Sequence, residues 1–196
     1  MKKFFFILFI LSVVAYFSPL SDDKYLDAIF PHFAIFSLAL SFLYAKNLKL
    51  TITKLGIPGK FNKNIKYAVA GFFAIILLLI ALTGIFRSLN INDYERVPLL
   101  VKQFPFYLLV FAILFAPISE ELFFRGVLTK HFGVFASSAL FGLAHFTYGS
   151  TAQVVATFVI GLLLAYIYKK TKSILPSILI HITYNAMSIL LIKFVL

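Results

Sequence analysis

Long apolar stretches separated by short polar segments make up most of this chain. A helix needs about 20 apolar residues to cross the hydrocarbon core of a bilayer. The apolar stretches predict seven such helices, the fifth and sixth of them short. Their expected ranges are Phe4–Leu20, Ala28–Ala45, Tyr67–Phe86, Pro105–Phe124, Gly133–Phe146, Gln153–Tyr168 and Ile174–Leu196. The pattern predicts an all-α, polytopic membrane helix bundle that forms a single membrane domain over residues 1–196.

Composition favours a membrane protein over a soluble one. Of the 196 residues, 62% are hydrophobic and only 13% are charged, whereas an ordinary soluble domain has roughly 25% charged residues. A soluble domain of this length leaves much of its surface in water and could not hide so much apolar surface. The chain has no cysteine, which excludes disulfides, thiolate nucleophiles and thiolate metal ligands.

The net charge of +11 comes from lysines that gather in alternate predicted loops. The loops on one side hold Lys2, Lys3, Lys46, Lys49, Lys54, Lys60, Lys63, Lys66, Lys130, Lys169, Lys170 and Lys172. The opposite side holds the loop acids Asp22, Asp23, Asp27, Asp93 and Glu95. Because basic residues concentrate in cytoplasmic loops, we expect a cytoplasmic N-terminus in a plasma membrane. Anionic lipid headgroups, rather than nucleic acid, are the expected partner of the lysines. The lysine-rich, cysteine-free composition suggests a prokaryotic cell.

Polar and charged side chains also occur inside the predicted helices of the second half of the chain. They are Glu120, Glu121, Arg125, His145, His181 and Asn185. Ionisable groups are costly inside a bilayer and therefore mark candidate functional sites. At 1.5 Å of rise per residue, Glu120, His181 and Asn185 lie about 10–17 Å deep, and His145 about 20 Å deep. We expect them to meet at one buried site, with His145 the least well matched in depth.

Helical spacing separates the roles of the two acids. Glu121 and Arg125 are four residues apart, so they share a helix face and can pair. Glu120 is rotated by about 100° from Glu121 and has no such partner. A buried, unpaired carboxylate suits a general base that takes a proton from water with the help of His145. The donors of His181 and Asn185 suit a developing oxyanion, so this set fits amide hydrolysis.

Three ordered motifs carry these residues on successive predicted helices. They read Glu120-Glu121-x-x-x-Arg125, Phe141-x-x-x-His145 and His181-x-x-x-Asn185. In this order they resemble the CPBP family, the CAAX-protease and bacteriocin-processing intramembrane metalloproteases. The resemblance covers roughly Pro105 to Asn185. It implies a CPBP-like catalytic core in residues 101–196, preceded by scaffold helices in residues 1–100.

The resemblance implies a CAAX-prenyl-protease-like intramembrane endopeptidase that cleaves membrane-associated or lipidated peptide or protein substrates. Glu120 and His145 would activate the water. His181 and Asn185 would stabilise the oxyanion, and the Glu121–Arg125 pair would hold the geometry.

The metalloprotease name of the family raises the question of zinc. Glu120, His145 and His181 could bind Zn²⁺ by ligand type. The paired His-Glu-x-x-His spacing of zincin helices is absent from the sequence. Two further histidines, His32 and His131, lie near predicted interfaces, and we interpret both as incidental.

Two other functional classes stay open. A bacteriocin-immunity protein or a membrane scaffold could keep this fold without turnover, with the same residues serving as a buried ion pair and interhelical hydrogen bonds. A proton-coupled transporter would also bury Glu and His. It is disfavoured because no second half of the chain mirrors the first, as transporter repeats do.

Overall fold

The computed structural model describes residues 25, 28–44 and 61–195, and every regular element in these residues is helical. The long helices are α3 (Phe30–Tyr44), α5 (Phe61–Ser88), α7 (Phe106–Glu120), α8 (Thr129–Ala144), α9 (Thr151–Thr171) and α10 (Leu175–Phe194). The shorter ones are η1 (Asp93–Glu95), α6 (Arg96–Gln103), the π-helix η2 (Glu121–Leu128) and η3 (Phe146–Tyr148). The predicted all-α class is confirmed.

Four helical runs among the described residues are long and apolar enough to cross a membrane. They are Phe61–Ser88, Phe106–Tyr148, Thr151–Thr171 and Leu175–Phe194, and a shorter apolar helix spans Phe30–Leu43. The 43-residue run is kinked at Gly133, where φ is +85°, a backbone conformation that favours glycine. The chain is therefore a multi-pass membrane protein. The fourth helix was predicted to end at Phe124, but η2 carries the helical path beyond that residue.

The first predicted helix, Phe4–Leu20, lies outside the described residues, so the count of seven and the cytoplasmic N-terminus stay predictions. The grouping of the loops into two sides has structural support. Lys63 Nζ donates to the carbonyl of Lys170 at 3.5 Å, and Asn64 Nδ2 donates to Ser173 Oγ at 3.2 Å. The start of α5 and the end of α9 therefore lie together, as two lysine-rich segments on one side require.

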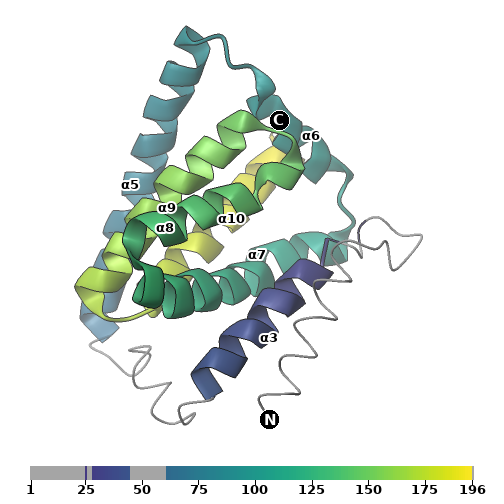
Figure 1. Ribbon diagram of the computed structural model, residues 1–196. Helices are drawn as coiled ribbons and strands as arrows, with labels where there is room; N and C mark the ends of the chain where they lie inside the picture. The colour runs from purple at the N-terminus through teal and green to yellow at the C-terminus, as the bar shows by residue number, and fades with distance from the viewer. Residues whose placement is uncertain (1–24, 26–27, 45–60, 196) are drawn as a thin grey trace.

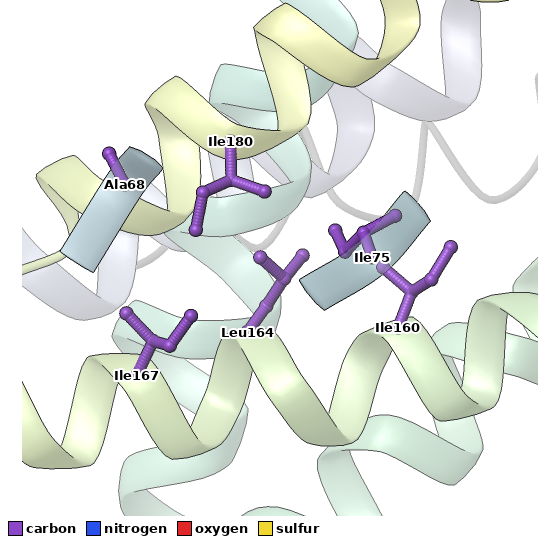
Figure 2. Close-up of a cluster of buried hydrophobic side chains, with 6 residues drawn as sticks. All are labelled: Ala68, Ile75, Ile160, Leu164, Ile167 and Ile180. Carbon is purple, nitrogen blue, oxygen red and sulfur yellow. The ribbon is translucent and has the colours of Figure 1, made fainter. Parts of the chain in front are cut away.

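A cluster of aliphatic side chains joins α5, α9 and α10 (Figure 2). Its members are Ala68, Ile75, Ile160, Leu164, Ile167 and Ile180. A Cβ atom at Gly71 of α5 would lie only 2.5 Å from Ile180 Cδ1, so the absent side chain allows this close approach. Helix association in a bilayer depends on such close packing. The cluster thereby sets the spacing of the helices around His181 on α10.

Helices α8 and α9 also pack through glycines. A Cβ atom at Gly142 would lie 2.9 Å from both Phe158 Cβ and the Val154 carbonyl oxygen. A Cβ atom at Gly161 would lie 3.2 Å from Ser138 Cβ. This contact fixes the end of α8, which leads directly into His145.

Helix α3 runs alongside α7 and contacts both α7 and η2 (Figure 1). Aromatic side chains fill the contact: the ring centroids of Phe33 and Phe115 are 4.8 Å apart, and those of Phe36 and Phe115 are 5.2 Å apart. A helix from the first half of the chain is thus packed against the helix that carries Glu120.

Candidate active site

The two adjacent acids lie where the helix changes type. Glu120 is the last residue of α7, and Glu121 is the first residue of the π-helix η2. The carbonyl of Phe124 accepts hydrogen bonds from the hydroxyls of Thr129, at 2.9 Å, and Ser137, at 2.7 Å. The Phe124 carbonyl also accepts from the backbone N–H of Thr129, so the two hydroxyls add further hydrogen bonds at the widened turn. Single π-turns of this kind are frequent at functional sites.

The two carboxylates face opposite nitrogens of one imidazole. Glu121 Oε1 lies 3.0 Å from His181 Nδ1, and Glu120 Oε2 lies 3.8 Å from His181 Nε2. Because an ionised carboxylate can only accept a hydrogen bond, we assign the proton of the neutral ring to Nδ1. Glu121 thereby fixes the tautomer and orientation of His181, so that Nε2 faces Glu120.

The predicted pair of Glu121 and Arg125 is confirmed. Glu121 Oε2 lies 3.1 Å from Arg125 Nε, and both side chains are almost completely buried. The guanidinium of Arg125 also lies over the ring of Phe141, 4.4 Å from its centroid. The charged groups of Arg125 and Glu121 are close enough to form an ion pair, but the angles at these atoms are not those of a hydrogen bond. Glu121 and the electron-rich face of Phe141 together compensate the buried positive charge.

His145 follows the last residue of α8 and is held by its own helix. Its Nδ1 lies 2.8 Å from the carbonyl oxygen of Phe141. A carbonyl can only accept, so Nδ1 carries the proton of the neutral ring and Nε2 is left as an acceptor. The His145 ring also contacts Tyr148, with ring centroids 5.8 Å apart. This arrangement leaves the imidazole able to take a proton at Nε2.

Asn185 is tied to the helix that carries Glu120. Its Nδ2 donates to the carbonyl oxygen of Ala112 on α7, at 2.9 Å. An amide nitrogen has two hydrogens, so one donor remains after this bond. The hydrogen bond also joins α10 to α7 about two turns before Glu120.

A cavity of about 440 Å³ is lined by all four residues predicted as catalytic: Glu120, His145, His181 and Asn185. The mismatch in depth expected for His145 does not separate it from the others. The supporting pair, Glu121 and Arg125, is absent from the cavity wall and lies behind it. Sequence spacing therefore predicted which side chains meet, and the fold divides them into a cavity-lining group and a buried supporting pair.

His32 of α3 also reaches the cavity, although we interpreted it as incidental. Its Nδ1 lies 3.4 Å from Glu120 Oε1 and 3.3 Å from Ser119 Oγ, and its ring lines the cavity. His32 therefore lies at the candidate site, and Glu120 is not without partners. The missed signal was an ionisable residue inside the apolar stretch Ala28–Ala45, the feature that marked the other site residues.

The described side chains do not form a metal site. No group of three or more His, Cys, Asp or Glu side chains in this part of the chain is placed to hold a metal ion. The predicted zinc trio of Glu120, His145 and His181 lines one cavity but does not form such a group.

A second polar cluster anchors the segment that follows His145. Asp93 of η1 accepts hydrogen bonds from the Ser150 hydroxyl, at 3.2 Å, and from the backbone N–H groups of Thr151 and Ala152 at the start of α9. Arg96 Nη1 donates to the carbonyl of Gly149 at 2.7 Å. A carboxylate beside a helix N-terminus also complements the helix dipole. Desolvation raises the pKa of Asp93, but the backbone and hydroxyl hydrogen bonds outweigh it and hold the pKa below its usual value of 3.8.

The hydrogen bonds of Asp93 predict that a variant without this carboxylate differs from the wild type in stability, and that the difference depends on pH. Asp93→Asn is expected to lower the free energy of unfolding by about 1 kcal/mol at pH 7, as loss of a helix cap does, which is a few degrees in Tm. Because the folded-state pKa is lowered, the stabilisation is complete above the usual pKa and disappears as pH falls through the folded value. Thermal melts of both proteins in detergent should therefore converge in acid.

The control for this prediction is Glu95→Gln, since Glu95 is an exposed acid on the same segment. It should melt like the wild type at every pH. A Tm difference for Asp93→Asn that stays constant from neutral to acidic pH would show that its carboxylate charge does not support α9.

Residues 102–187 match the family described as type II CAAX prenyl endopeptidase Rce1-like. The match includes all six residues singled out in the second half of the chain and leaves out α3 and α5. No curated protein and no solved structure matches the chain.

Proposed function

Residues 102–187 form a domain of the Rce1-like family of type II CAAX prenyl endopeptidases, and we propose that this protein hydrolyses peptide bonds of membrane-associated or lipidated substrates within the membrane. The observation that carries the proposal is the shared cavity lined by Glu120, His145, His181 and Asn185. A carboxylate, two imidazoles and an amide around one space are suited to adding water to a carbonyl group.

In the proposed first step, Glu120 takes a proton from a water molecule. Its Oε2 has no hydrogen-bond partner among the described residues, and the 3.8 Å to His181 Nε2 is too long for a direct hydrogen bond. In this proposal one water molecule bridges the two atoms. The water oxygen bonds to the substrate carbonyl carbon, one proton passes to Glu120, and the acceptor Nε2 of His145 holds the other water hydrogen.

In the second step, His181 and Asn185 stabilise the oxyanion. Nε2 of His181 is a donor when the ring carries two protons; the second is taken from solvent before the water attacks, and the Glu121 carboxylate at 3.0 Å stabilises the positive charge of the ring. The remaining amide hydrogen of Asn185 supplies a further donor. Glu120 then gives its proton to the leaving nitrogen as the C–N bond breaks, which releases an amine and a carboxylic acid.

The rest of the cavity wall supports an apolar substrate. Beyond the polar cluster it is lined by side chains such as Val101, Leu108, Phe111 and Ile192. Such a wall suits an apolar peptide segment or an attached lipid. Purified protein in lipid nanodiscs, given prenylated peptides, their unprenylated forms and transmembrane peptides, should produce new peptide termini detectable by mass spectrometry. Intact peptides of every class, with a biological function that survives Glu120→Gln, would favour an immunity or scaffold protein.

Chelation is expected to leave the hydrolysis rate unchanged, because the described residues offer no group of three metal ligands. The measurement is the rate of peptide cleavage before and after treatment with a strong zinc chelator. A zinc protease of the His-Glu-x-x-His type, assayed in the same lipid, is the positive control and should lose activity. A loss of cleavage that added zinc restores would contradict the metal-free mechanism.

A further inference from the structure

The geometry points to a functional contribution from the first half of the chain: we infer that His32 of α3 is a positioning residue, which orients the Glu120 carboxylate through the contact of its Nδ1 with Oε1, 3.4 Å away. The inference rests on the proposed function, in which Glu120 is the general base. Helix α3 lies outside the family match at residues 102–187, so the match itself gives His32 no role.

The hydrogen bonds of Ser119 determine which nitrogen of His32 carries the proton. The hydroxyl of Ser119 donates its single hydrogen to the carbonyl of Ala116 at 2.8 Å. Its oxygen can therefore only accept from His32 Nδ1, which lies 3.3 Å away. Nδ1 is thus the protonated nitrogen. It is hydrogen-bonded to Ser119 Oγ, and Oε1 of the next residue, Glu120, lies 3.4 Å from the same nitrogen.

The two oxygens of Glu120 consequently have different surroundings. Oε1 faces the His32 donor at 3.4 Å. Oε2 faces His181 Nε2 at 3.8 Å and has no hydrogen-bond partner among the described residues. The contact of Oε1 with the His32 N–H limits the rotation of the carboxylate and keeps Oε2 beside His181 Nε2, where the proposed water would bind.

Packing holds the His32 ring in place. The ring makes an edge contact with Phe111 of α7, with centroids 5.4 Å apart. Phe33, the next residue of α3, and Phe36, one turn beyond His32, both pack on Phe115 of α7. Ala39 is completely buried. A positioning group needs such a rigid support, because small errors in the placement of a catalytic group reduce the rate steeply.

Substitutions of His32 separate a hydrogen-bonding role from a packing role. The Asn side chain places an N–H close to the position of imidazole Nδ1, whereas Ala removes the donor. We expect His32→Ala to lower kcat by about 10–100-fold with little change in KM, since a misplaced base can cost up to about 100-fold. His32→Asn should recover most of this loss. His131→Ala is the matched control, because His131 Nδ1 contacts the Val127 carbonyl and its ring does not line the cavity.

An unchanged kcat in His32→Ala would overturn the inference. So would a folded His32→Asn protein as slow as His32→Ala, because the ring rather than its donor would then matter.

A second measurement does not depend on activity. Thermal melts of His32→Ala, Glu120→Ala and the double variant form a double-mutant cycle. The contact between the two residues predicts that the double variant loses less Tm than the two single losses added together. Strictly additive losses would overturn the inference. The Tm losses could instead be non-additive while the wild-type protein cleaves no peptide. That result would reject the protease function but support the contact between His32 and Glu120.

Discussion

Glu120→Gln is expected to abolish proteolysis in a protein that still inserts and folds. Gln keeps the size of the side chain and an oxygen that can accept from His32, but it cannot take a proton from water. Loss of a general base typically lowers the rate by about 10²–10⁴-fold. Proteomic comparison of membranes from cells that express either protein should show uncut substrates accumulating with the variant.

The control for this experiment is Glu95→Gln, which makes the same chemical change at an exposed acid outside the cavity. It should leave the pattern of membrane protein termini unchanged. If Glu120→Gln supports full biological function at normal expression, Glu120 is not a general base, and a role in immunity or scaffolding becomes the better account.

Arg125→Ala is expected to have the largest effect on stability. It leaves the completely buried carboxylate of Glu121 without its positive partner and removes the side chain that packs on Phe141. Removing one member of a buried ion pair typically lowers the free energy of unfolding by about 3–5 kcal/mol. In a chain of this length that corresponds to a Tm decrease of roughly 10 °C. Melting curves in detergent and the yield of folded protein provide the measurement.

A double variant shows whether the stability lost in Arg125→Ala comes from the unpaired charge of Glu121 or from the lost volume of the Arg125 side chain. Glu121→Leu with Arg125→Met replaces both charges by apolar groups of similar size, which often restores or improves stability. We expect it to melt well above Arg125→Ala but to remain inactive, because His181 Nδ1 loses its carboxylate partner. Lys130→Ala, which removes an exposed cation, is the control and should melt like the wild type. An Arg125→Ala protein with the wild-type Tm would contradict the structural role of the pair.

The helices could be predicted from the lengths of the apolar stretches, because the thickness of a bilayer sets the length of a helix that crosses it. A fifth helix was predicted to begin at Gly133, which is where the helical run is kinked, and the i,i+4 spacing of Glu121 and Arg125 gave their pairing directly. The π-helix at residues 121–128 could not be predicted, because the sequence pattern does not reveal which helical turn takes an extra residue. The helical path extends beyond the predicted end because η2 continues to Leu128 and α8 follows it directly.

The site was predictable where residues share a motif and unpredictable where distant helices meet. The residues of the three motifs line or support one cavity. Local spacing could not show that Glu121 would bind His181, or that Asn185 would donate to Ala112, since both contacts join α10 to another helix. His32 was missed because its role depends on α3 lying beside α7, which is a feature of tertiary packing.

Peptide cleavage in ¹⁸O-labelled water tests the central claim most directly. Purified wild-type protein in nanodiscs is incubated with the peptide set, and the new C-termini are analysed by mass spectrometry beside those from Glu120→Gln. If Glu120 activates water in the cavity, the wild type produces new C-terminal carboxyl groups that carry one ¹⁸O atom, and the variant produces almost none. Labelled products formed equally fast by both proteins would contradict the account.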